Sequence, residues 1–407
     1  MNFRIRRPEP VLLLAALVLA AGSFATPSSA APKATDQKSS ATPDRPRAEM
    51  QKVFEAVANL LPIALSEQGW SDPARRPEIQ RWIDALAERS VVLEQHGMQR
   101  DAGFRHLSRA LSADIEEVRE RYRAGRFEES RFFMIEATGN CVACHSRLPD
   151  STDFQMADTL IDRIEFDSLS THEQTQILVA TRQFERAMTA WEQLFADASI
   201  PPAEFDLGGY ILDYMTIGLR VESDPARVSK TLATLASRPD VPLYLRRHLD
   251  SWVVALNSTA DDLASSERLE RARSLVGGQR LVGDAPLARD QTVYDLVASS
   301  LLLQFVDEPG VTDLRRAEAY YLLGLVESRT IDSHWVPQAE VHLESAIRLA
   351  PETAIAENAY AVLEEYVIIG WGGASSVDLP ADQWAKLREL RELIDQRTAA
   401  PGQKRAK

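Results

Sequence analysis

Cysteine is almost absent from this chain, with only two among 407 residues, at positions 141 and 144. So few cysteines exclude a disulfide-rich scaffold and a zinc site built from two cysteine pairs. Glycine is also scarce, at 18 residues. Leu, Ala, Glu and Arg dominate most windows instead, and because these residues favour helices, the composition predicts an all-α protein.

Positive charge is in deficit, because 46 Lys and Arg face 60 Asp and Glu and the net charge is -14. Phosphate backbones and anionic lipids are bound by clustered basic side chains. The composition therefore argues against nucleic acid and anionic membrane surfaces as partners. It is compatible with a basic protein partner.

Long apolar runs are missing as well. The stretch from Val11 to Ala21 has eleven residues, whereas a transmembrane helix needs about 20. It follows a cluster of arginines and precedes the small residues Ser28-Ser29-Ala30, which is typical of a Sec-type signal peptide. We therefore expect residues 1–30 to direct export to the periplasm and to be removed, leaving no membrane span.

The two cysteines lie in the segment Cys141-Val142-Ala143-Cys144-His145. Two residues between cysteines, followed directly by His, form the signature of c-type haem attachment. On one helical turn the two sulfurs point the same way and can add to the two haem vinyl groups. His145 can then supply the proximal imidazole to the iron. The sequence predicts one covalent haem c on Cys141, Cys144 and His145, and it indicates no catalytic residue.

Three other interpretations of this segment compete with haem. A structural zinc site needs four ligands, and the segment offers three. A thioredoxin-like pair opens a helix after a strand, and no such pattern surrounds Cys141. A plain disulfide would leave His145 without a role.

Apolar residues recur at helical spacing before the motif. They form three stripes: Met50, Val53, Phe54, Val57, Leu60 and Leu61; Ile79, Trp82, Ile83, Leu86 and Leu93; Phe104, Leu107, Leu111, Ile115, Val118 and Tyr122. A fourth helix is expected from Phe127 to about Leu148, ended by Pro149. Four such helices with short connections predict an antiparallel bundle over residues 47–150, after a flexible linker at 31–46 that is rich in Pro, Ser and Thr.

With the motif late in its fourth helix, the region from about 45 to 150 resembles the class II cytochromes c, the cytochrome c′ and c-556 family. The resemblance implies electron transfer or gas binding at the haem, and it allows a homodimer. A class I cytochrome c would carry its motif on an early helix and a Met ligand well downstream. Met156 lies only eleven residues past His145, so class I fits less well.

The sixth iron ligand is open. Low-spin relatives place a Met in the first helix, and Met50 stands there in this sequence, although it could equally be the first core residue of its stripe. His96 and His106 are remoter candidates. Met134 fits this role less well, because on the same helix it would lie about 16 Å from His145 along the axis and on the proximal side.

Residues 151–400 are again helical in pattern, and a basic tail at 401–407 is expected to be disordered. The segment 317–351 resembles a tetratricopeptide repeat, with Tyr320, Leu323 and Gly324 on one helix, Ala339, Leu343 and Ala346 on the next, and Pro351 at the close. The turn between them is lengthened around Ile331–Trp335. A weaker copy runs from Gln183 to Leu194, and a helix from Ala356 to Ile369 would stack on the clear repeat.

Four scattered histidines (His172, His248, His334 and His342) are expected to be surface or satisfied core residues.

Together these patterns predict a periplasmic mono-haem cytochrome whose repeat domain docks a redox or complex-forming protein. The alternative is an interaction scaffold in which the repeat domain is primary and haem is a redox or structural element. A haem enzyme such as a peroxidase ranks last because no distal acid/base His or Arg pair is visible. An electron carrier or haem-binding protein is therefore favoured over an enzyme.

Overall fold

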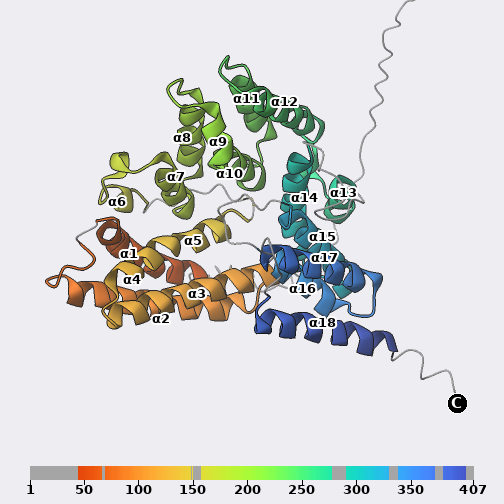
Figure 1. Cartoon of the computed structure of the whole chain (residues 1–407), viewed down its shortest axis with the longest axis horizontal. Helices are drawn as coiled ribbons and strands as arrows, with labels where there is room; N and C mark the ends of the chain where they lie inside the picture. The colour runs from red at the N-terminus through yellow and green to blue at the C-terminus, as the bar shows by residue number, and fades with distance from the viewer. Residues whose placement is uncertain are drawn as a thin grey trace, which may run out of the picture. The chain divides into compact units, whose positions relative to one another are not determined.

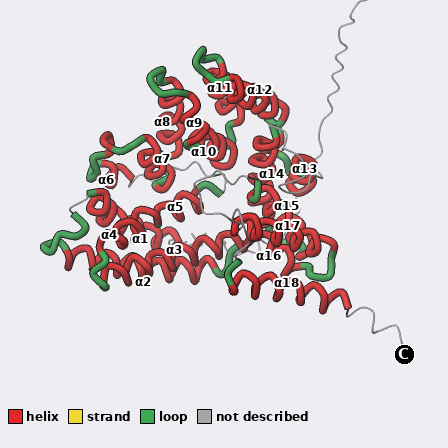
Figure 2. The backbone as a smooth tube through the Cα atoms, viewed as in Figure 1, coloured by secondary structure: helices red, strands yellow, loops and turns green. Residues whose placement is uncertain are grey.

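The computed structural model describes residues 45–66, 69–147, 149, 157–276, 290–329, 338–371 and 379–399. The regular secondary structure of these residues is helical. Figure 2 shows no strand in this part of the chain. The predicted all-α fold is confirmed. The signal peptide, residues 31–44 of the linker and the basic tail lie outside the described residues, as do Met156 and His334.

The first five helices are α1 (Arg45–Leu65), α2 (Arg76–Gly97), α3 (Ala102–Arg123), α4 (Phe127–Glu136) and α5 (Thr138–His145). The next are α6 (Ala157–Ile161), α7 (Thr171–Ala180), α8 (Phe184–Ala196), α9 (Pro202–Leu207), α10 (Tyr210–Thr216), α11 (Pro225–Ala236), α12 (Leu243–Ser258) and α13 (Arg268–Val276). The last are α14 (Gln291–Val306), α15 (Asp313–Glu327), α16 (Ala339–Leu349), α17 (Ala354–Trp371) and α18 (Ala381–Ala399). Short turns of other helix types occur at η1 (Phe166–Ser168), η2 (Ile217–Val221) and η3 (Asp262–Ala264).

Helices α1 to α4 lie side by side around a core of their own (Figure 1). The predicted stripes supply most of that core, including Val53, Leu60, Ile79, Ile83, Leu86, Ile115 and Val118. Trp70, between α1 and α2, is fully buried and meets Tyr122 edge to face at 5.7 Å. This aromatic contact closes the end of the bundle where α1 and α3 finish.

The fourth helix departs from the prediction of one element from Phe127 to about Leu148. It stops at Glu136, turns at Ala137 and resumes as α5, which ends at His145. Thr138 and Gly139 are poor helix formers, and the Thr138 hydroxyl donates to the Ile135 carbonyl at 2.7 Å. The first helix also differs from the prediction. Helix α1 already begins at Arg45, so Arg45 and Pro46 belong to a helix and not to the predicted linker.

The helices of the second half pack in adjacent pairs, such as α7 with α8, α11 with α12 and α15 with α16. The two helices expected within 317–351 are confirmed as α15 and α16, and the helix expected at 356–369 is α17. The predicted weaker copy lies on α8, which buries Phe184, Ala187, Met188, Trp191 and Leu194. The lengthened turn at 331–335 lies outside the described residues. Membership of the tetratricopeptide family stays a prediction.

The described residues from 45 onward belong to one compact unit, and α3 contacts α16 directly. The α5 residue Val142 joins the large core of the second half and not that of the bundle. The predicted domains at 47–150 and 151–400 therefore share an interface, and the boundary between them stays a prediction.

Gly324 allows the close approach of α15 and α16. A Cβ atom at this position would lie 2.4 Å from Leu343 Cγ and 3.2 Å from the Leu343 backbone nitrogen. We expect Gly324→Ala to lower the free energy of unfolding by about 1–3 kcal/mol, because the helices must separate. Gly370→Ala on α17 is the matched control, since nothing lies within 4 Å of its added methyl group. Urea unfolding of both variants checks this, and equal effects would contradict it.

Candidate functional site

The Cys-x-x-Cys-His segment forms the last turns of α5. Cys141, Cys144 and His145 each keep some exposed surface, whereas Val142 and Ala143 are buried. Neither cysteine is in a disulfide. The helix thus points Val142 and Ala143 into the protein, whereas Cys141, Cys144 and His145 lie on a turn that is only partly covered.

The surroundings of the two thiols oppose their ionisation. Although the side chains are partly exposed, enough protein surrounds the sulfurs that burial raises the pKa of Cys141 to about 11. Burial raises the pKa of Cys144 to about 12, with Arg147 acting in the opposite direction. Reactive cysteines of thiol–disulfide enzymes have lowered pKa values. These electrostatics therefore count against the thioredoxin-like interpretation.

His145 is oriented by a backbone carbonyl. Its Nδ1 lies 2.9 Å from the carbonyl oxygen of Ala180, the last residue of α7. Because a carbonyl oxygen can only accept, Nδ1 carries the proton and donates it, which places the lone pair of the ring on Nε2. Histidines that ligate metals are held in this way, with the second nitrogen bonded to a carbonyl or carboxylate. Two thiols and an imidazole are the donor types that a c-type haem uses.

Polar contacts fix the motif helix at both ends. Before the motif, Asn140 Nδ2 donates to the Asp114 carboxylate of α3 at 2.7 Å. After it, the Ser146 backbone N–H closes the last turn on the Val142 carbonyl at 3.0 Å. Arg147 then forms an ion pair of 2.7 Å with Asp101, and both side chains are at most 4% exposed. The motif helix is thus tied to α3 at both of its ends.

A buried polar cluster extends from Arg147 into the second half of the chain. Its members are Asp101, Arg147, Tyr320, Gln338 and His342. Arg147 also hydrogen-bonds to Gln338, which immediately precedes α16. Asp101 caps α3 by accepting from the N–H groups of Gly103 and Phe104. The Tyr320 hydroxyl of α15 accepts from the Ala102 N–H at 2.9 Å. The cluster therefore joins the residues after the motif to the α15–α16 pair.

His342 lies at the edge of this cluster, stacked on Tyr320 with the rings 5.8 Å apart. It is fully buried, and among the described residues neither of its ring nitrogens has a hydrogen-bond partner. Burial, assisted by the positive charge of Arg147, lowers the pKa of His342 well below its usual range. The expectation that the scattered histidines are surface or satisfied residues is thus wrong for His342. His172 and His248 are half-buried.

The candidate sixth ligands Met50, His96 and His106 lie on α1, α2 and α3 respectively. Met50 on α1 is half-buried and packs against the bundle core, so its role as distal ligand stays a prediction. Met134 is fully buried in that core. His96 and His106 are half-buried, and burial lowers the pKa of His106.

The sequence identifies the motif but not the cluster around Arg147. Gln338 and Arg147 are 191 residues apart, and Ala102 and Tyr320 are 218 apart. No local pattern connects such residues.

No family model matches the chain, and neither a curated protein nor a solved structure is significantly similar to it. Within the described ranges, no three His, Cys, Asp or Glu side chains gather as a metal cage. Among the same residues, no helix is both long and apolar enough to cross a bilayer.

Proposed function

We propose that this chain is an exported mono-haem c-type cytochrome that carries haem on Cys141, Cys144 and His145. The observation that supports it best is the His145 Nδ1 contact with the Ala180 carbonyl, in a helix that also presents both thiols. A disulfide or thiol redox role would not need a preoriented imidazole next to Cys144. When bound, the haem supplies one-electron chemistry or binds a gas at its iron.

Different residues of the chain have different roles in the proposed haem site. The two cysteines would hold the haem through thioether bonds, and His145 would supply Nε2 to the iron, while the Ala180 carbonyl accepts the Nδ1 proton. Arg147 and Asp101 hold the chain directly after the ligand. Because this ion pair is buried and continues into α15 and α16, the haem region and the repeat-like helices are expected to act as one body.

An interaction scaffold is the second candidate, and the paired helices of the second half favour it. In that function haem is a structural or redox element, and a partner would bind equally well without it. The two candidates separate when a haem-free variant is compared with the haem-loaded protein for retention of its periplasmic partner.

The visible absorption spectrum of the periplasmically expressed protein tests the proposed function. Expression uses a host competent in cytochrome c maturation, and spectra are taken oxidised and reduced, with and without CO. We expect a covalent haem spectrum. Sharp low-spin bands that ignore CO would indicate a sixth protein ligand and electron transfer, with Met50 the next residue to replace. A broad high-spin spectrum that shifts with CO would indicate gas binding. A protein without haem bands would overturn the proposal.

A further inference from the structure

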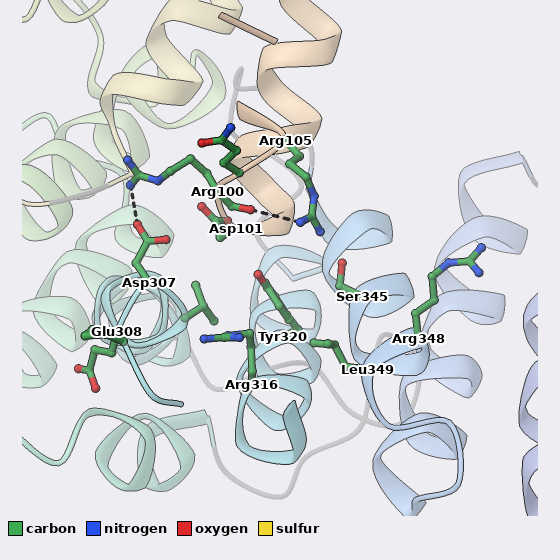
Figure 3. A pocket seen from close by; sticks show the side chains of 13 residues that line it. Arg100, Asp101, Arg105, Asp307, Glu308, Arg316, Tyr320, Ser345, Arg348 and Leu349 are labelled. Atoms are coloured by element: carbon green, nitrogen blue, oxygen red, sulfur yellow. Dashed lines mark hydrogen bonds and ion pairs between the residues drawn. The ribbon is translucent and has the colours of Figure 1, made fainter. Parts of the chain in front are cut away.

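A cavity of about 560 Å³ opens between the turn that joins α2 to α3 and the helices α14, α15 and α16 (Figure 3). Its volume is in the range of small-molecule sites in proteins. Three of its lining residues, Val306, Pro309 and Leu349, are apolar. The remainder is dominated by charged side chains, so the balance of these charges decides what the cavity can accept.

Every acidic side chain that lines the cavity already has a basic partner. The three ion pairs are Asp307 with Arg100 at 2.8 Å, Asp101 with Arg147 at 2.7 Å, and Glu308 with Arg268 at 2.5 Å. Another lining residue, Arg348, pairs with Glu344 and Glu389. Arginines thus neutralise the acidic side chains that line the cavity. These side chains supply no unpaired negative charge that would attract a cation.

Two arginines of the wall are not neutralised. Within the described part of the chain, neither Arg105 nor Arg316 forms an ion pair, and the Nε of Arg316 is buried without a hydrogen-bond partner. Arg105 Nη1 donates to the backbone carbonyl of Arg100 at 3.2 Å. The two arginines come from α3 and α15, and Figure 3 shows the Tyr320 hydroxyl between their guanidinium groups. Together they supply uncompensated positive charge and several N–H donors.

Each guanidinium group matches the geometry of a carboxylate or phosphate group, to which arginine can donate two parallel hydrogen bonds. We propose that this cavity binds a small organic anion. Its carboxylate or phosphate group lies between Arg105 and Arg316, and its apolar body lies against Val306 and Leu349. Association is favoured by the partial shielding of the charges from water, which strengthens each ion pair.

The site is independent of the haem, but it shares two residues with the cluster that follows the haem motif. Asp101 and Tyr320 line the cavity, and they also contact Arg147 and the Ala102 N–H. An anion here would lie against the same residues that hold the chain after His145. The binding measurement below does not depend on haem loading, so failure of this proposal leaves the proposed function untouched.

Isothermal titration calorimetry on the full exported chain tests the site with phenyl phosphate and benzoate as probes. We expect saturable binding of at least one probe at one site, and the stronger of the two identifies phosphate or carboxylate as the preferred group. Arg105→Gln and Arg316→Gln should each weaken that binding by about tenfold or more, which is the loss of about one charged hydrogen-bonding group.

Arg315→Gln is the matched control. Arg315 neighbours Arg316 on α15 but pairs with Glu270 outside the cavity, so its substitution should leave the affinity unchanged. Arg316→Lys keeps the positive charge at this position. Circular dichroism compares the fold of each variant with that of the wild type, and an unchanged spectrum shows that weaker binding comes from the cavity and not from unfolding. The proposal is overturned if neither probe binds saturably, or if Arg315→Gln weakens binding as much as Arg316→Gln.

Discussion

The double substitution Cys141→Ala and Cys144→Ala is expected to remove all covalently attached haem. These are the only cysteines of the chain, so no other side chain can form the thioether bonds. The measurement is a haem-stained denaturing gel together with the absorption spectrum of the acid–acetone-extracted protein. We expect covalent haem to survive extraction in the wild type and to be undetectable in the double variant.

His145→Ala is the control that separates attachment from ligation. The variant keeps both thiols, so its haem should stay on the chain through the thioethers, but the spectrum should lose its proximal imidazole character. The Ala180 carbonyl then lacks its donor, but α7 should keep its fold because the contact is a single hydrogen bond. Covalent haem that persisted in the double cysteine variant would show that the motif assignment is wrong.

The sequence predictions that the structure confirms depend on local patterns of residues. The helical stripes need only a regular spacing, and this spacing alone places Val53, Ile83 and Ile115 in the core. It does not reveal the break at Ala137, because apolar residues continue across it. Thr138 and Gly139 are the signal of that break, since both are weak helix formers next to each other.

Interactions between distant residues could not be predicted. The repeat pattern identifies Tyr320 as a core residue, but nothing in its neighbourhood shows that its hydroxyl caps the Ala102 N–H of another helix. In sequence His342 resembles any isolated histidine, and its burial depends on how α16 packs on α15. Arg105 and Arg316 are two of many arginines, and only the structure distinguishes them as the two cavity-lining arginines that have no carboxylate partner among the described residues.

Arg147→Leu is expected to cause the second large effect, a loss of about 3–5 kcal/mol in the free energy of unfolding. The substitution leaves the Asp101 carboxylate, which is 3% exposed, without its guanidinium partner. Asp101 also caps α3, and Gln338 before α16 loses its contact in the same substitution. The damage therefore reaches both α3 and α16. Urea unfolding of the variant and of the wild type, both in the same haem state, measures this loss in the free energy of unfolding.

Two further variants decide whether the buried charge is the cause. Adding Asp101→Asn to Arg147→Leu removes the unpaired charge while keeping a capping side chain, and we expect it to restore part of the lost stability. Arg186→Ala breaks an ion pair with Asp158 whose side chains are 44% and 71% exposed, and it should cost about 1 kcal/mol or less. If Arg147→Leu cost no more than Arg186→Ala, the Asp101–Arg147 pair would not be what holds the end of the haem motif to α3.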